Sequence, residues 1–145
     1  MSFKDIRAVQ MNWKDVSDDI SGFGCAVFEE LFVVNESYSD LFTGINQTGP
    51  LTAGNPKMRE HAVRVFSALG SWIGALSDTP VLDGLLTLQG QEHLERKVGD
   101  SHFNDMRVAL FKGLSGRLGS KFARSSWDAV YTLIQDGLGK GWNPK

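Results

Sequence analysis

The chain is short of several features that mark whole classes of protein. It has one cysteine, Cys25, among 145 residues, so no disulfide can form within it, and we expect a reducing, cytoplasmic setting. No stretch approaches the roughly 18 uncharged apolar residues of a membrane-spanning helix, and the first residues show no apolar run of signal-peptide length. The formal net charge is −2, which gives no reason to expect nucleic acid or an anionic membrane as a partner.

Common catalytic motifs are absent as well. The sequence has no Gly-rich dinucleotide motif, no phosphate-binding loop and no CxxC pair, and its adjacent Glu29 and Glu30 lack metal-site spacing. We interpret Cys25 as a small buried side chain rather than a reactive thiol. His102 is expected to be exposed at the start of a helix, and Trp142 has no assigned role.

What the chain does contain is a helical period along most of its length. Hydrophobic residues make up 41% and charged residues 22%, the proportions of a globular protein, and 145 residues suit one domain, 1–145, with one core. Apolar residues recur at spacings of three and four, and no alternating pattern of strand length appears. The sequence therefore predicts an all-α fold of seven to eight helices.

Capping residues indicate where helices begin. Ser2 is the expected N-cap of the first helix. Asn55-Pro56 pairs an N-cap with a first-turn proline, and Ser77-Asp78-Thr79-Pro80 repeats that signal. Residues 43–54 contain three glycines and one proline, so we expect a loop there.

Glycines are expected to mark helix ends, with one exception. Gly22 and Gly24, near the start of the second helix, favour a second helix crossing close by, or else they are tolerated surface glycines. Gly84 and Gly90 are expected to interrupt the helical region of residues 81–96. Gly113, Gly116 and Gly119 are expected to end the next helix, and Gly139 with Gly141 the last one.

His93 is the first of two histidines that carry a functional hypothesis. It stands among leucines, and a neutral imidazole is a strong axial ligand for haem iron. Its near ring nitrogen would donate to a backbone carbonyl one turn earlier, near Gln89. Taken alone, His93 equally fits a partly exposed helix histidine without a role.

His61 is the second, and Val65 follows it on the same side of one helix. A histidine above an open iron site can donate a hydrogen bond to bound dioxygen, worth about 1.5–3 kcal/mol, or roughly 10–150-fold in affinity. Taken alone, His61 fits a core histidine with a satisfied partner. Two histidines on separate helices suggest a cavity with nitrogen donors on opposite sides, and haem, a flat metal cofactor, between them.

The order of these features resembles the globin family. Residues 61–70 resemble the globin distal helix, and the likeness covers nearly the whole chain. It is closest in style to invertebrate, annelid-like single-domain haemoglobins and myoglobins. Trp13 matches the tryptophan of the first globin helix. Residues 31–42 resemble the globin segment that ends in the phenylalanine that stacks on haem. His93, with Val98 and Phe103 behind it, resembles the proximal segment.

The resemblance implies a globin fold around a pocket for haem b, iron protoporphyrin IX. It implies reversible dioxygen binding at ferrous haem for transport or storage, with carbon monoxide and nitric oxide as further ligands, and not an enzyme. His93 would be the proximal iron ligand and His61 the distal donor, with Val65 and Phe28 near the ligand. The further cofactor contacts expected are Phe42, Arg64, Leu94, Lys97, Val98, Phe103 and Met106.

Three departures from the globin pattern affect the site's surroundings. Glu36 stands where globins commonly have proline, Gln89 stands where a leucine usually precedes the proximal histidine, and the segment between the two histidines is longer than in vertebrate relatives. Phe28 replaces a common leucine, and a larger apolar side chain near the ligand should exclude water and slow oxidation of the iron.

Alternatives from other classes remain open. One is a haem enzyme on the same fold, such as a peroxidase or a nitric-oxide dioxygenase, which steady peroxide-dependent turnover would favour. Another is a ligand sensor, favoured if His61 itself ligates iron. A third is a haem-free interaction bundle, favoured if the pure protein is colourless. A homo-oligomer is also possible.

Overall fold

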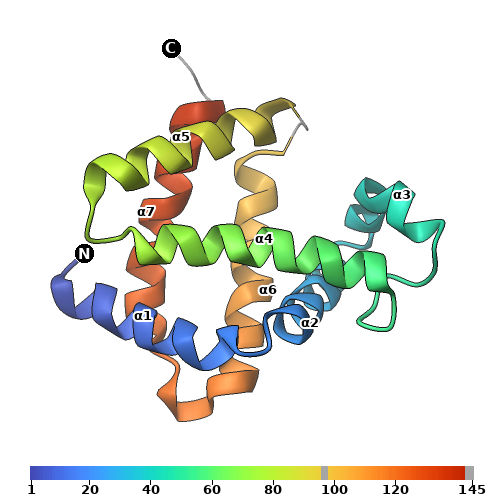
Figure 1. Cartoon of the computed structure of the whole chain (residues 1–145), viewed down its shortest axis with the longest axis horizontal. Helices are drawn as coiled ribbons and strands as arrows, with labels where there is room; N and C mark the ends of the chain where they lie inside the picture. The colour runs from blue at the N-terminus through green and yellow to red at the C-terminus, as the bar shows by residue number, and fades with distance from the viewer. Residues whose placement is uncertain (96–97, 143–145) are drawn as a thin grey trace.

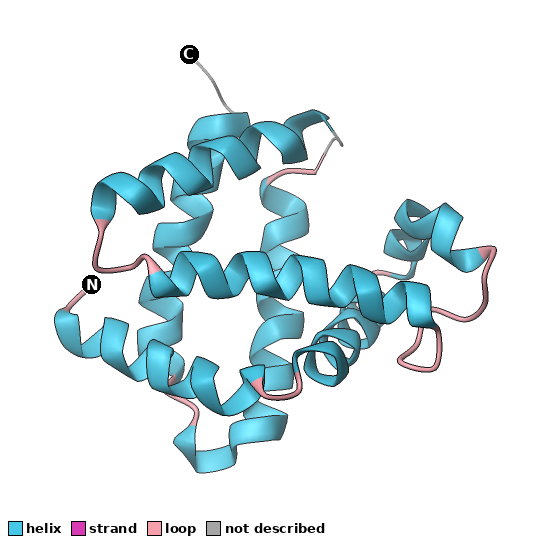
Figure 2. Ribbon diagram, viewed as in Figure 1, coloured by secondary structure: helices cyan, strands magenta, loops and turns pink. Residues whose placement is uncertain are grey.

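The computed structural model describes residues 1–95 and 98–142, which form helices and connecting loops with no strand (Figure 2). The predicted all-α fold is confirmed, with seven α-helices in the described part of the chain. The helices, with two short 3-10 segments labelled η, are α1 Phe3–Ser17, α2 Ile20–Val34, η1 Glu36–Phe42, α3 Thr43–Asn46, α4 Pro56–Gly74, α5 Thr79–Glu95, α6 Asp100–Leu118, η2 Gly119–Lys121 and α7 Arg124–Trp142.

The capping residues begin helices where the sequence predicts. Ser2 caps α1 by accepting a hydrogen bond from the Asp5 amide at 3.2 Å, and the Asp5 side chain accepts one from the Ser2 amide. Asn55 caps α4 by accepting from the Lys57 amide at 3.0 Å, and Pro56 occupies the first turn. These two residues therefore fix the point at which α4, the helix that carries His61, begins.

The loop predicted for residues 43–54 is wrong at its beginning, where α3 covers Thr43–Asn46. The Asn46 side chain donates to the Ser39 carbonyl at 3.1 Å, and Ile45 packs against the core. These contacts with η1 and the core stabilise one helical turn that the glycine-rich composition does not indicate.

The breaks predicted in residues 81–96 are also wrong, because α5 runs unbroken through Gly84 and Gly90. A Cβ atom at Gly90 would collide with the Leu138 carbonyl of α7, and one at Gly141 would lie 2.5 Å from the Thr87 carbonyl of α5. The two backbones are therefore in contact. For the same reason α7 continues past residues 139–141 to Trp142.

Gly113 and Gly116 likewise fail to end α6, which runs to Leu118 and stops at Gly119 with a φ of +55°. A Cβ at Gly113 would lie 2.7 Å from Val27 of α2. At Gly24 it would lie 2.7 Å from Phe66 of α4, which confirms the close crossing expected there. Gly22 differs, since its neighbour is the capping side chain of Asp19.

Figure 1 shows α4 crossing the middle of the molecule, with α5 and α1 on either side of it and α6 and α7 running across behind. Within the core, α5 packs on α7, and α2 packs on both α4 and α6. Contacting rings of Trp13, Phe23 and Phe66 lead from α1 toward the centre.

Cys25 is buried and burial raises the pKa of its thiol, which confirms it as a small packing residue.

Asn12 joins distant parts of this framework. Its side-chain oxygen accepts from the Ala123 amide at 2.9 Å and from the Trp127 indole at 3.1 Å, and its amide donates to the Lys121 carbonyl at 3.0 Å. A buried asparagine with three partners fixes α1 against the start of α7.

Among residues 1–95 and 98–142, no helix is long and apolar enough to cross a membrane.

Candidate functional site

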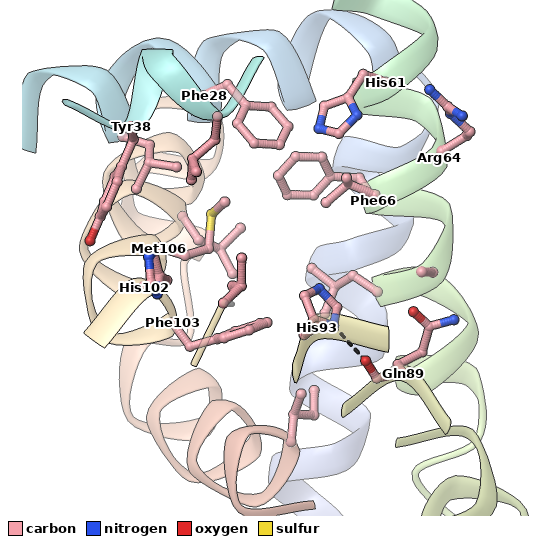
Figure 3. Close-up of a pocket in the computed structure, with 18 of the residues that line it drawn as sticks. Phe28, Tyr38, His61, Arg64, Phe66, Gln89, His93, His102, Phe103 and Met106 are labelled. Carbon is pink, nitrogen blue, oxygen red and sulfur yellow. Dashed lines mark hydrogen bonds between the residues drawn. The ribbon is translucent and has the colours of Figure 1, made fainter. Parts of the chain in front are cut away.

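A cavity of about 660 Å³ lies between α2, η1, α4, α5, α6 and α7 (Figure 3). Its size falls within the range of about 300–1,000 Å³ found for ligand and cofactor sites. Figure 3 shows His61 at one end and His93 at the other, with Met106 and Phe103 along one side. The cavity therefore has nitrogen-bearing rings at both ends and mainly apolar walls.

The structure brings most of the predicted site residues to this cavity. Leu94 is not among the lining residues, and it is 46% exposed on the surface of α5. Lys97 lies outside the described residues. Arg64 lines the cavity but is exposed, so it belongs to the rim. The other predicted residues that line it are Phe28, Phe42, His61, Val65, His93, Val98, Phe103 and Met106.

His93 is fixed by a hydrogen bond to its own helix. Its Nδ1 lies 2.6 Å from the Gln89 carbonyl oxygen, the acceptor that the sequence predicts. A carbonyl oxygen can only accept, so Nδ1 carries the proton and Nε2 of the neutral ring keeps its lone pair. Figure 3 shows this bond at the lower end of the cavity. The arrangement leaves Nε2 able to ligate a metal.

His61 packs against two aromatic rings at the opposite end, and these rings also contact each other. Its ring centroid is 5.3 Å from that of Phe28 and 5.0 Å from that of Phe42, which meets it nearly edge-on at 82°. Val65, one turn further along α4, is half-buried and lines the same space. The imidazole is therefore surrounded on this side by apolar groups.

The donor set fits haem. One imidazole of fixed tautomer faces the cavity from α5, and a second faces it from α4. The described part of the chain has no group of three or more His, Cys, Asp or Glu side chains that could hold a metal ion by itself. Iron at this site would take its remaining ligands from a flat macrocycle, and the apolar walls suit such a group.

Sequence reasoning missed a polar cluster on the α6 side of the cavity. The Tyr38 hydroxyl donates to the Asp105 carboxylate, and the Tyr38 ring lies 5.3 Å from that of His102. Burial and the neighbouring carboxylate raise the pKa of Tyr38. The expectation of an exposed His102 is wrong, since it is half-buried and lines the cavity, where its Nδ1 accepts from the Gly99 amide at 3.1 Å.

A second set of contacts involves His93 and two aromatic residues of α6 and α7. The Phe103 ring meets the His93 ring with centroids 5.1 Å apart and planes at 74°, and the Trp142 indole stacks on the Phe103 ring at 5.0 Å and 28°. The Tyr131 hydroxyl donates to the Phe103 carbonyl at 2.6 Å, and burial raises the pKa of that hydroxyl. No periodic or motif signal in the sequence connects Trp142 with His93.

Comparison with known proteins gives a consistent result. A family model described as Globin matches residues 25–138. A protein named Globin from Aequiyoldia eightsii is 32% identical over 146 residues, which cover 97% of this chain and 99% of the relative. The Globin-2 B chain of Anadara inaequivalvis is 26% identical over 135 residues, which cover 90% of this chain and 87% of the relative.

A plant protein is similar as well. A protein named as an anaerobic nitrite reductase from Brassica napus is 26% identical over 134 residues, which cover 88% of this chain and 83% of the relative. The resemblance to invertebrate globins is confirmed, and the two animal relatives named above are bivalve globins.

Proposed function

Because the chain belongs to the globin family, whose members bind haem, we propose that it binds dioxygen reversibly at ferrous haem b for oxygen transport or storage. The observation that carries the proposal is the pair of histidines at opposite ends of one apolar cavity, one of them held in a single tautomer by the Gln89 carbonyl.

Each end of the cavity has a distinct role in this proposal. His93 supplies the Nε2 lone pair as the proximal ligand, and its bond to Gln89 increases the basicity of that nitrogen. Bound haem would supply the ferrous iron at which dioxygen binds. His61 donates a hydrogen bond to dioxygen, while Phe28 and Val65 restrict the space for water.

The remaining walls would hold the macrocycle. Phe42 would stack on the macrocycle, and Val98, Phe103 and Met106, which line the same cavity, would contact it. Arg64 at the rim suits a carboxylate at the cofactor's edge, because a guanidinium forms charge-assisted hydrogen bonds with carboxylates. A matching role for Lys97 stays a prediction.

Repeated oxygenation tests the proposed function. The purified, reduced protein is exposed to air and then deoxygenated several times while its visible spectrum is recorded. The proposal expects the oxygenated and deoxygenated spectra to interconvert over several cycles with little conversion to the ferric form. Oxidation at the first exposure to air would contradict a role in transport or storage.

A second candidate function follows from the plant relatives named as anaerobic nitrite reductases. Reduction of nitrite to nitric oxide consumes one electron, which ferrous haem iron would supply, and two protons, and it releases one water molecule. His61 is the side chain placed to donate one of these protons near the ligand end of the cavity, and solvent would supply the other. Nitric oxide formation from nitrite by the reduced protein under argon, lowered by His61→Leu, would favour this activity. The absence of nitric oxide formation by the wild type would argue against this activity, and formation that is unaffected by His61→Leu would argue against the role of His61 in it.

Two further expectations remain predictions. The Anadara relative is named as one chain of a globin, so self-association is worth measuring by light scattering after size-exclusion chromatography. The cytoplasmic location is likewise a prediction, which rests on the single buried cysteine.

A further inference from the structure

We propose that Trp142 is a positioning residue for His93, which acts through Phe103 and so makes the last turn of α7 a determinant of the iron–histidine bond. The proposal rests on the proposed ligation of haem by His93. Three aromatic rings form a continuous contact from α7 through α6 to α5.

The hydrogen bond of His93 does not fix the rotation of its ring about the Cβ–Cγ bond. The bond from Nδ1 to the Gln89 carbonyl fixes the tautomer, but a hydrogen bond tolerates a range of ring orientations about the Cβ–Cγ bond. Phe103 meets the ring nearly edge-on, with centroids 5.1 Å apart. This contact limits the remaining rotation, because a turned imidazole would collide with the phenyl ring or lose contact with it.

Phe103 is itself held at two places. Its carbonyl accepts from the Tyr131 hydroxyl at 2.6 Å, and its amide donates to the Gly99 carbonyl at 3.1 Å, so its backbone is fixed. Its ring is stacked on Trp142 at 5.0 Å, with the planes 28° apart. With the backbone fixed, the indole determines how far the phenyl ring can tilt away from His93.

Trp142 is anchored against the helix that carries His93. The neighbouring Gly141 is packed so closely on α5 that an added Cβ would lie 2.5 Å from the Thr87 carbonyl and 2.6 Å from the Gln91 amide nitrogen. The indole is 7% exposed, and its Nε1 has no hydrogen-bond partner among the described residues. Stacking and backbone packing, rather than a hydrogen bond, therefore place this ring.

The test compares the wild type with two Trp142 variants and one control variant by resonance Raman spectroscopy of the ferrous form, which records the iron–histidine stretching band directly. Trp142→Leu removes the stacked ring and should shift and broaden the band. Trp142→Phe keeps an aromatic ring in that place and should retain the wild-type band. Haem loss to an excess of an acceptor globin should become about 10-fold faster in Trp142→Leu, as is common when groups behind a metal ligand are changed.

Trp13→Leu is the matched control. Trp13 is 8% exposed and contacts the rings of Phe23 and Trp127, so its loss removes a similar aromatic contact far along the core. We expect a comparable drop in melting temperature and an unchanged iron–histidine band. An unchanged band in Trp142→Leu, or an equal change in Trp13→Leu, would overturn the positioning role.

Failure of the positioning role of Trp142 can be told apart from failure of the proposed haem binding. A wild-type protein that takes up no haem would refute haem ligation by His93. The positioning claim would then be decided in the haem-free protein by nuclear Overhauser contacts between the His93 and Phe103 rings. These contacts must weaken in Trp142→Leu and persist in Trp142→Phe, and equal contacts in both would overturn it.

Discussion

At the scale of single residues, His61 is defined by its aromatic neighbours. The ring centroids of Phe28 and Phe42 lie 5.3 and 5.0 Å from that of His61, and 5.6 Å from each other. Apolar neighbours lower the local dielectric, and a hydrogen bond from the imidazole to a partly charged ligand is stronger there than in water. The same crowding leaves less room for water beside the ligand.

The first prediction concerns that hydrogen bond. His61→Leu should raise the dioxygen dissociation rate by roughly 10–150-fold, the equivalent of about 1.5–3 kcal/mol for a bond to a charged group. Stopped-flow displacement of dioxygen by carbon monoxide measures the rate. Carbon monoxide dissociation serves as the internal control, since that ligand carries little charge and should change much less. Equal effects on both gases would contradict the assignment.

The second prediction concerns the exclusion of water. Phe28→Leu should accelerate autoxidation of the oxygenated protein, because a smaller side chain leaves space for water beside the ligand. Phe32→Leu is the matched control, since Phe32 stacks on Phe28 at 6.4 Å without lining the cavity. An unchanged autoxidation rate in Phe28→Leu, followed by absorbance in air, would refute this role.

The sequence predicts the relative positions of side chains correctly where both residues lie on the same helix. The spacing of His61 and Val65 places both on one side of α4, and the acceptor for His93 lies one turn earlier on the same helix. The contact of Tyr38 with His102 could not be predicted in this way. It depends on how closely η1 approaches α6, which no local pattern records.

At the scale of helices, the crossing of α5 and α7 holds the His93 end of the site. The backbones touch at Gly90 and Gly141, so a side chain larger than hydrogen at either position must separate the helices. This packing explains why α5 continues through its glycines despite their low helix propensity. It also keeps the last turn of α7 beside α5.

The third prediction compares two glycines of α5. Gly90→Ala should destabilise the fold by about 1–3 kcal/mol, the usual result of overpacking, because the new methyl meets the Leu138 carbonyl. Gly84→Ala is the control, since nothing lies within 4 Å of its added Cβ, and it should stabilise the helix by about 0.5–1 kcal/mol. Urea unfolding measures both changes, and effects of the same sign would contradict the close crossing.

Helix starts could be predicted from the sequence, whereas glycines inside helices could not. Asn55 and Pro56 act through bonds and dihedral angles within a few residues, so the dipeptide suffices to locate the start of α4. A glycine signals either a helix end or a close approach. Only the packing of another element, here α7 on Gly90 or α2 on Gly113, separates these two meanings.

At the scale of the whole molecule, buried polar groups join the elements around the cavity. Asn12 fixes α1 to the start of α7 through three hydrogen bonds. Tyr131 joins α7 to α6 through the Phe103 carbonyl, and burial raises the pKa of its hydroxyl above the ordinary value of 10.0. These contacts link the stability of the fold to the geometry of the site.

The fourth prediction uses the titration of Tyr131. Its pKa is higher in the folded than in the unfolded chain, so its contribution to stability is complete below pH 10 and is lost as pH rises further. Tyr131→Phe should lower the unfolding free energy at pH 8 by about 0.5–1.5 kcal/mol, because the hydrogen bond from the Tyr131 hydroxyl to the Phe103 carbonyl is lost. Its stability should also decline less steeply above pH 10. Parallel pH profiles for variant and wild type would contradict the raised pKa.

The central claim is that His93 ligates haem iron while His61 faces the ligand side without ligating it. The most direct measurement is the absorption spectrum of the reduced protein before and after carbon monoxide, for the wild type and for His93→Gly with and without free imidazole. The account predicts a five-coordinate ferrous spectrum that shifts with carbon monoxide, is lost in His93→Gly and returns with imidazole. A six-coordinate spectrum before carbon monoxide is added, or a His93→Gly spectrum like that of the wild type, would contradict it.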